Sequence, residues 1–254
     1  MTVNTGRVLN DSSTDPYYGL ALDHALLLHN PRSEYLATIR FWRNPSSVIL
    51  GRGQTLSNEI NQLFCREQKI PIARRITGGG TVYHDEGNLN ISLFFPKSVI
   101  ENPDNIRETT SRFTNLLKTS LETSGMEAIS VDVSNNLLYH NRKVSGAAAY
   151  FTRDTILHHS TLLLTTDLNK LEGSLIHHKE PRRGFSKYTP TTNLTELQPE
   201  TWKTTYTKLL EESFKTHFQP GIITPEEETL ATKLKETMYR KPSWIIDGER
   251  PKEP

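Results

Sequence analysis

Three consecutive glycines, Gly78, Gly79 and Gly80, follow a pair of arginines in the segment RRITGGGTVYHDEGNLNISL, residues 74–93. Glycine has no Cβ atom, so the backbone amides here can come close to a carbonyl or phosphate oxygen and can adopt positive φ. Arg75 places a cation beside them. A glycine-rich turn between solvated arginines is the alternative. The residue types favour a binding site over a plain turn.

A second group of residues surrounds Lys143 in the segment RKVSGAAA, residues 142–149. An ammonium group can bind the carbonyl oxygen and the phosphate of an activated carboxyl together, which stabilises charge that develops as the acyl bond forms or breaks. A lysine in a strand is more commonly a solvated surface residue. Gly146 and Ala147, however, leave space for another backbone or a ligand. Lys143 is therefore a candidate catalytic residue.

The elements that must position these residues alternate irregularly between helix and strand, without repeats. Periodicity and capping signals predict helices at 16–29, 58–68, 103–123, 168–175, 200–217 and 225–239. Strands are predicted at 35–42, 47–51, 70–75, 81–84, 90–95, 128–133, 137–139, 143–150 and 158–164. The segment 177–192, rich in Pro, Gly, Arg and Lys, is predicted to be a mobile loop.

Some of these predictions are specific enough to be tested by a structure. The strands 35–42 and 47–51 are expected to pair, and strands 81–84 and 90–95 are expected to form a hairpin that turns at residues 85–88. Ile60, Leu63 and Phe64 are expected on the buried side of the second helix. Thr224 and Glu227 have the spacing of a capping box at the start of the last helix.

Composition restricts the class of protein. The chain has 254 residues, 35% of them hydrophobic, which is enough for one substantial core. With 30 basic and 29 acidic residues, the net charge of +1 favours neither nucleic acid nor a membrane surface as partner. The sequence shows no apolar run of bilayer length and no leader-like start, so we expect a soluble, cytoplasmic protein. The single cysteine, Cys65, excludes an internal disulfide.

Three sequence blocks together resemble one family. They are RRITGGGTVYHDEGNLNISL at 74–93, RKVSG at 142–146 and HHSTLL at 158–163, and they occur in the order found in the lipoate-protein ligase A family of the biotin/lipoate ligase superfamily. The resemblance runs from about Leu20 to about His217. It implies an α/β (α+β) fold with a central, mainly antiparallel or mixed sheet flanked by helices, as in biotin ligases and class II aminoacyl-tRNA synthetases.

The resemblance also implies roles for individual residues. In this family the lysine of the RKVSG block contacts the acyl-adenylate, which assigns that catalytic role to Lys143. His159 resembles a histidine on the cleft wall, and His158 should point away because neighbouring strand residues alternate in direction. Asp85 is expected to anchor the hairpin. The residues expected to bind lipoate or lipoyl-AMP are Arg75, Thr77, Gly78, Gly79, Gly80, Val82, His84, Asn90, Ser145, Gly146, Ala147, His159 and Thr161.

One position departs from the family pattern. Many members have an Asn-Asp pair where this chain has Asn135 and Asn136, and the acidic residue of that pair assists magnesium or the adenine side of the nucleotide. Both asparagines are placed on the nucleotide side by resemblance, and a simple turn before Leu137 is the alternative. No protein ligand for a metal is assigned. The adjacent histidines do not suggest a zinc site, because zinc requires three or four converging ligands.

The expected reaction uses ATP and Mg²⁺ to convert (R)-lipoate into lipoyl-AMP, and then transfers the lipoyl group to a lysine of an acceptor protein. The acceptor would be a lipoyl domain or a carrier like that of the glycine-cleavage system. We expect a catalytic domain at 1–220 and a C-terminal helical extension at 221–254. Longer ligases of the family carry an accessory domain, and residues 239–244 resemble its start, so a separate small accessory subunit is expected to supply it.

Three alternatives stay open from the sequence. A lipoyl or octanoyl transferase would act without ATP or on preformed lipoyl-AMP; related transferases use a cysteine, but Cys65 lies in a predicted helix and is better explained as a small buried residue. A biotin ligase shares the fold and the adenylate chemistry. A non-catalytic binding protein could also use this fold.

The basic segment at His177, His178, Lys179, Arg182, Arg183 and Lys187 could close over the adenylate or be a solvated loop.

Overall fold

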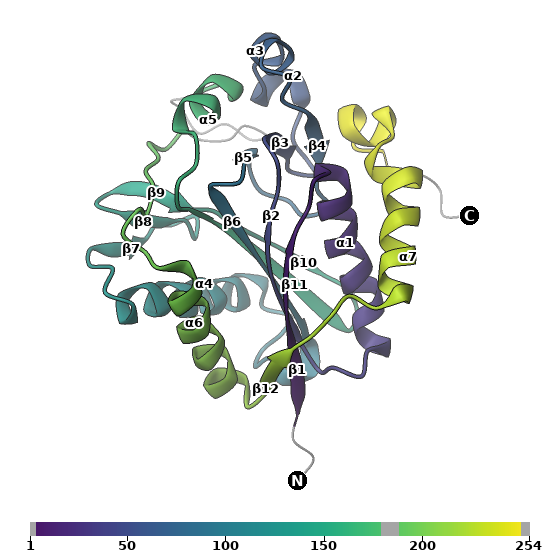
Figure 1. Ribbon diagram of the computed structural model, residues 1–254, viewed down its shortest axis with the longest axis vertical. Helices are drawn as coiled ribbons and strands as arrows, with labels where there is room; N and C mark the ends of the chain where they lie inside the picture. Colours follow the sequence, from purple (N-terminus) through teal and green to yellow (C-terminus); the bar gives the residue numbers. More distant parts are fainter. Residues whose placement is uncertain (1–3, 179–187, 250–254) are drawn as a thin grey trace.

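A six-stranded mixed sheet forms the centre of the computed structural model, which describes residues 4–178 and 188–249 (Figure 1). The strand order is β10-β11-β6-β2-β1-β12. The strands are β1 (Thr5–Ser12), β2 (Thr38–Arg43), β6 (Asn88–Pro96), β10 (Ala147–Phe151), β11 (Thr155–Leu163) and β12 (His217–Pro220). β1 runs parallel to β2 and β12, while the pairs β2–β6, β6–β11 and β11–β10 are antiparallel. The predicted α/β fold class with a mainly antiparallel sheet is confirmed.

Helices cover both faces of this sheet (Figure 1). On one face α1 (Pro16–His29) packs against α7 (Pro225–Leu234), and on the other α4 (Ile106–Thr123) packs against α6 (Pro199–Phe214). Side chains alternate between these two layers along each strand. Phe41 and Phe95 belong to the α4–α6 core, whereas Trp42 and Phe94 belong to the α1–α7 core. Because each of these aromatic residues is buried in one layer, the residue next to it along the strand faces the other layer.

Two small sheets carry parts of the first two sequence blocks, and the third block, at 158–163, lies on β11 of the central sheet. In the first, β3 (Ser47–Leu50) lies between β4 (Ile72–Arg74) and β5 (Val82–His84). In the second, β8 (Leu137–Tyr139) lies between β7 (Ile129–Val131) and β9 (Arg142–Ser145). The glycine loop follows β4, and Lys143 lies on β9.

The strands were predicted at nearly the right places, but two predicted pairings are wrong. β2 and β3 belong to different sheets, and so do β5 and β6. Both edges of β6 are occupied by β2 and β11, which leaves none for β5. The turn itself is present, because the Asp85 carboxylate accepts hydrogen bonds from the amides of Gly87 (2.9 Å) and Asp167 (2.8 Å). Asp85 therefore anchors a turn that passes from one sheet to another.

The predicted helix 58–68 is broken into α2 (Leu56–Glu59) and α3 (Gln62–Glu67). Asn61 starts the second piece by accepting a hydrogen bond from the Phe64 amide, which interrupts the assumed periodicity. Leu63 is consequently 61% exposed instead of buried, while Ile60 is buried. In the same way, the predicted strand 143–150 is divided at Gly146 between β9 and β10.

The remaining helices agree with prediction except at their ends. α4 begins at Ile106, after an Asn105 cap, and does not include Pro103. α5 spans Leu168–Ser174, and Thr224 and Glu227 form the predicted capping box of α7. The helix continues as the π-helical turn η3 (Lys235–Tyr239), and a separate π-helical turn, η4 (Ser243–Asp247), follows after a break. Short 3₁₀ turns η1 and η2 cover Asn30–Arg32 and Lys97–Val99.

Two further outcomes concern segments rather than helices. The edge strand β12 and the strand β1 beside it were not predicted. Of the predicted loop 177–192, residues 179–187 lie outside the described part of the chain. Residues after it bridge to β9, because the Lys143 amide donates to Pro190 O (2.7 Å) and the Thr192 amide donates to Lys143 O (3.0 Å). Across residues 4–178 and 188–249, no helix has the length and apolarity needed to cross a membrane.

Candidate active site

A cavity of about 880 Å³ lies where the glycine loop, the β7–β9 sheet and the central sheet meet. This volume is in the range of sites that bind cofactor-sized molecules. The predicted residues in its wall are Arg75, Gly79, Gly80, Val82, His84, Asn90, Asn136, Lys143, Gly146, Ala147, His159 and Thr161. Thr77, Gly78 and Asn135 are not in this wall, and Ser145 lines a smaller cavity next to it. The three sequence blocks therefore converge.

Lys143 lies in the cavity wall, and the end of its side chain lies along the backbone of Gly146. A Cβ atom at position 146 would be 3.2 Å from Lys143 Nζ and 3.6 Å from Asn136 Oδ1, so a larger residue there would displace the ammonium group. Burial lowers the pKa of Lys143, the nearby Asp132 carboxylate raises it, and Arg75 lowers it further. An anion bound in the cavity would favour the charged form and offset the effect of burial.

Two glycines, Gly79 in the loop and Gly51 beside it, are needed for the shape and the packing of the glycine loop. Gly79 has φ of +83°, a left-handed conformation that is strained for residues with a Cβ atom. Its carbonyl oxygen also lies against Gly51, where an added Cβ would come within 2.0 Å of it. Two backbone segments thus meet without side chains between them, and the loop is held close to β3.

Arg75 holds the shape of this loop. Its guanidinium group donates to Gly78 O (2.6 Å), Gly80 O (2.7 Å), Ile49 O (3.2 Å) and the Thr77 hydroxyl (2.8 Å). The side chain is buried, and desolvation lowers the pKa of Arg75 to about 10. Arg75 was predicted as a ligand-binding residue. The structure uses most of its donors within the loop, which also explains the positions of Thr77 and Gly78 behind the wall.

The neighbouring histidines of β11 point to opposite faces of the sheet, as predicted. His159 lines the cavity, its Nε2 is 2.7 Å from the Thr77 hydroxyl, and its Nδ1 is 3.5 Å from the Asp23 carboxylate. His158 is buried on the other face, where its ring stacks on Phe113 with centroids 5.0 Å apart. The pairing with Asp23 fixes the orientation of the His159 ring.

His84 is a second histidine in the cavity wall. Its Nδ1 is 3.3 Å from the Asn44 side-chain amide, and its ring meets Trp42 edge to face. Burial, with Arg75 and His159 nearby, lowers the pKa of His84 to about 3. His84 is therefore neutral at physiological pH. It can form hydrogen bonds to a ligand but contributes no positive charge.

Asn135 and Asn136, which differ from the family pattern, occupy different environments in the structure. Asn136 lies in the cavity wall, whereas Asn135 has φ of +59° and accepts a hydrogen bond from Ser111 of α4. Asp132, which the sequence analysis did not select, lines the same wall. Its carboxylate accepts hydrogen bonds from the Asn136 amide (2.9 Å), the Asn136 side chain (2.8 Å) and the Ser134 amide (2.8 Å).

The signal for Asp132 was present in the sequence, because an aspartate two to four residues before a polar turn commonly caps it. Among the described residues, Asp132 is the carboxylate that lines the large cavity. No cluster of three or more His, Cys, Asp or Glu suited to a metal ion occurs within residues 4–178 and 188–249. Cys65 is buried in a separate apolar cluster with Ile60 and Leu171, as expected for a packing residue.

Comparison with known proteins shows the family of this chain. The chain belongs to the lipoyl protein ligase A/B catalytic domain family, which it matches over residues 15–219. An Aeropyrum pernix protein named "Putative lipoate-protein ligase A" is 33% identical over 214 residues, which cover 82% of this chain and 78% of the relative.

Two solved structures extend the likeness to nearly the whole fold. A lipoate-protein ligase A bound with ATP superposes with a TM-score of 0.82 at 25% identity, covering 96% of this chain and 100% of the other. A bi-partite lipoate protein ligase of Thermoplasma acidophilum, studied with its E2 lipoyl domain, gives a TM-score of 0.81 at 25% identity and covers 98% of both chains. The family resemblance of the sequence blocks is confirmed.

Proposed function

We propose that this protein is a lipoate-protein ligase that activates (R)-lipoate with ATP to lipoyl-AMP and transfers the lipoyl group to a lysine of an acceptor protein. The observation that carries the proposal is the position of Lys143 in the wall of one large cavity that it shares with the glycine loop. The family membership and the similar ATP-bound ligase support this assignment.

In the first half-reaction the lipoate carboxylate attacks the α-phosphate of ATP and pyrophosphate leaves. Two anions must approach each other, so groups that neutralise negative charge lower the barrier. Lys143 supplies a positive charge, and the backbone of Gly79 and Gly80 can approach the ligand without side chains intervening. Mg²⁺ bound with ATP would neutralise phosphate charge. Magnesium prefers oxygen ligands, and the Asp132 carboxylate in the cavity wall would supply one.

In the second half-reaction the amine of the acceptor lysine attacks the carbonyl carbon of lipoyl-AMP. The new amide bond forms, the bond from carbon to phosphate oxygen breaks, and AMP leaves with the bonding electrons. Lys143 can donate hydrogen bonds to the carbonyl oxygen and the phosphate, where negative charge develops. His84, Asn90, His159 and Thr161, which lie in the same wall, would orient the acyl group.

Lys143→Ala tests the proposal directly. The variant should bind ATP and fold normally but lose lipoyl-AMP formation and acceptor modification by at least 100-fold, because a positioned charge at the reacting atoms is absent. A non-catalytic binding protein would instead keep its full affinity for a partner and modify nothing. Supplying biotin in place of lipoate, with mass spectrometry of the acceptor, separates the two ligase specificities.

The alternative of a thioester-forming transferase has little support. Cys65 is the single cysteine of the sequence, and it lies on α3 outside the cavity with Sγ 3.9 Å from Ser174 O. Burial raises the pKa of Cys65, which disfavours the thiolate that would act as nucleophile. Acceptor modification that needs no ATP would revive the alternative.

We further propose that residues 1–220 form the catalytic domain and that 221–254 serve as the attachment site for a separate accessory subunit, with a lipoyl domain as the acceptor. The bi-partite ligase of T. acidophilum, whose structure was analysed with its E2 lipoyl domain, supports a separate subunit and a lipoyl domain as acceptor. The C-terminal turn is joined to β4, because Arg74 donates to Ile245 O (3.0 Å) and Ile246 O (2.9 Å) and Trp244 Nε1 donates to Arg74 O (2.9 Å). A subunit bound there would contact the strand that precedes the glycine loop.

Pyrophosphate release with and without a candidate subunit tests this second proposal. We expect the partner to raise the rate at least 10-fold, and full activity of the isolated chain would contradict it. Because ATP and the proposed acceptors are found inside cells, the proposal places the reaction in the cytoplasm. A carrier of the glycine-cleavage type can be compared with the lipoyl domain in the same assay.

A further inference from the structure

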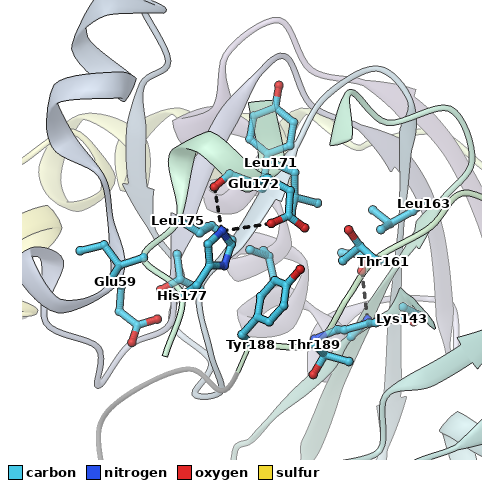
Figure 2. A pocket seen from close by; sticks show the side chains of 17 residues that line it. Glu59, Lys143, Thr161, Leu163, Leu171, Glu172, Leu175, His177, Tyr188 and Thr189 are labelled. Atoms are coloured by element: carbon cyan, nitrogen blue, oxygen red, sulfur yellow. Dashed lines mark hydrogen bonds and ion pairs between the residues drawn. The ribbon is translucent and has the colours of Figure 1, made fainter. Parts of the chain in front are cut away.

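Lys143 borders two cavities of different size, so it can be approached from two sides. The smaller cavity has a volume of about 90 Å³. Figure 2 shows Glu59 and His177 on one side of this space and Lys143 with Thr161 on the other. It is too small to admit a loop of another protein, whereas the large cavity, of about 880 Å³, is not. An acceptor protein therefore has to approach Lys143 from the side of the large cavity.

The turn between β7 and β8 forms part of the rim of the large cavity. Val131, Asp132, Val133, Ser134 and Asn136 all line this cavity. Val133 is at the same time 96% exposed, the largest fraction among the exposed large apolar residues in 4–178 and 188–249. A side chain that borders a cavity and also faces solvent lies at the mouth of that cavity. Val133 is therefore an apolar side chain at the entrance to the proposed active site.

The hydrogen bonds of this turn hold Val133 in its outward position. The Asn135 amide donates to Asp132 O (3.0 Å), which closes a β-turn with Val133 and Ser134 at its two central positions. The Asp132 carboxylate accepts a hydrogen bond from the Ser134 amide (2.8 Å), and the Ser111 hydroxyl of α4 donates to the Asn135 side chain (3.0 Å). A valine side chain also has few rotamers. Little conformational freedom is thus left to be lost when a partner binds here.

The turn is connected to the reaction centre through the β7–β9 sheet. β8 leads away from the turn and pairs antiparallel with β9, where Leu138 lies opposite Lys143. Leu137 and Val144, each next to one member of this pair, are buried in the α4–α6 core. A protein bound at the turn would consequently have a defined position relative to Lys143.

We propose that the β7–β8 turn is a docking site for the acceptor protein, and that Val133 fits into an apolar depression beside the acceptor's target lysine. The inference rests on the proposed function, in which that lysine must reach the carbonyl carbon of lipoyl-AMP. Single exposed apolar side chains are common on protein surfaces. Val133 differs from them because a rigid turn presents it at the mouth of the active site. Its removal from water favours binding and leaves the target lysine free to enter the large cavity.

Val133→Asn tests the docking site without adding a charge, and asparagine is well suited to a turn. With preformed lipoyl-AMP and a lipoyl domain as acceptor, we expect KM for the acceptor to rise about 10-fold, while kcat changes less than 2-fold. The Kd for lipoyl-AMP, measured by calorimetry, should also change less than 2-fold. Val133→Ile keeps an apolar, β-branched side chain and should retain the wild-type KM.

Leu63→Asn is the matched control, because Leu63 is 61% exposed but lines neither cavity. It should transfer with the wild-type KM. The inference is overturned if Val133→Asn also keeps the wild-type KM. It is equally overturned if Val133→Asn weakens lipoyl-AMP binding as much as it raises KM, because Val133 would then contact the ligand instead of the acceptor.

Light scattering of the same variants tests a different occupant of the turn. If the wild-type chain is a dimer that Val133→Asn converts to monomers, the turn binds a second copy of the chain, and the inference is overturned. We expect the same mass for both proteins. Failure of the wild-type chain to bind lipoyl-AMP at all would instead remove the proposed function.

Discussion

Replacing Arg75 by lysine should destabilise the protein, because the guanidinium group holds the glycine loop through four hydrogen bonds. A lysine ammonium in this position can keep one or two of them. Each hydrogen bond to a charged group contributes about 1.5–3 kcal/mol, and a carbonyl at the cavity wall recovers part of this by binding water. We therefore expect a loss of about 3 kcal/mol in the free energy of unfolding.

For a chain of this size, that loss corresponds to a decrease in Tm of roughly 6–12 °C. Thermal unfolding followed by circular dichroism measures it, with Arg52→Lys as the control at an exposed arginine on the adjoining turn. The Kd for lipoyl-AMP should rise as well, since the loop loses its shape. The reasoning is refuted if Arg75→Lys keeps its Tm within 2 °C while ligand affinity falls, because Arg75 would then act as a direct ligand.

Three further predictions follow from other contacts. Gly51→Ala should weaken lipoyl-AMP binding at least 10-fold in calorimetry, because the new methyl group would be 2.0 Å from Gly79 O; an unchanged Kd would contradict this. Trp244→Phe should lower the free energy of unfolding by about 1 kcal/mol in urea, through loss of the bond to Arg74 O, and an unchanged midpoint would contradict it. Burial holds the pKa of His158 at about 3, so the folded state stays neutral while the unfolded chain binds a proton below about pH 6.5. This residue should therefore remove about 2 kcal/mol of stability between pH 7 and pH 5, and His158→Leu should show a correspondingly smaller loss; equal losses in both proteins would refute the assignment.

Local sequence signals predicted the helices well. α1 begins at Pro16 after Asp15, whose side chain accepts a hydrogen bond from the Tyr17 amide, and the capping box of α7 is present as its spacing indicates. Strand positions were also recognisable from alternation. Such signals act within a few residues, so they report where an element begins and which of its faces is apolar.

Strand pairing could not be predicted in the same way, because it depends on which edges are free. β5 and β6 are close in sequence but lie in different sheets. The break at Asn61, which exposes Leu63, depends on a single side-chain cap inside an apparently periodic helix. In both cases the surroundings of a segment decide its structure, although its own sequence predicts a regular element.

The candidate site was predicted in its composition but not in its internal bonding. The motifs indicated Lys143, the glycine loop and His159, and the structure brings them to one cavity. The sequence could not show that most donors of Arg75 are taken by backbone carbonyls, because these atoms carry no residue-specific signal. The turn signal at Asp132 was present in the sequence, but it did not show that this carboxylate lies in the cavity wall beside Asn136.

A crystal structure with a stable analogue of lipoyl-AMP tests the central claim most directly. We expect the analogue in the large cavity, with its carbonyl and phosphate oxygens within hydrogen-bonding distance of Lys143 Nζ and with Gly79 and Gly80 against the mixed anhydride. An analogue bound elsewhere, or a Lys143 side chain turned to solvent in that complex, would contradict the assignment of Lys143 as the catalytic residue.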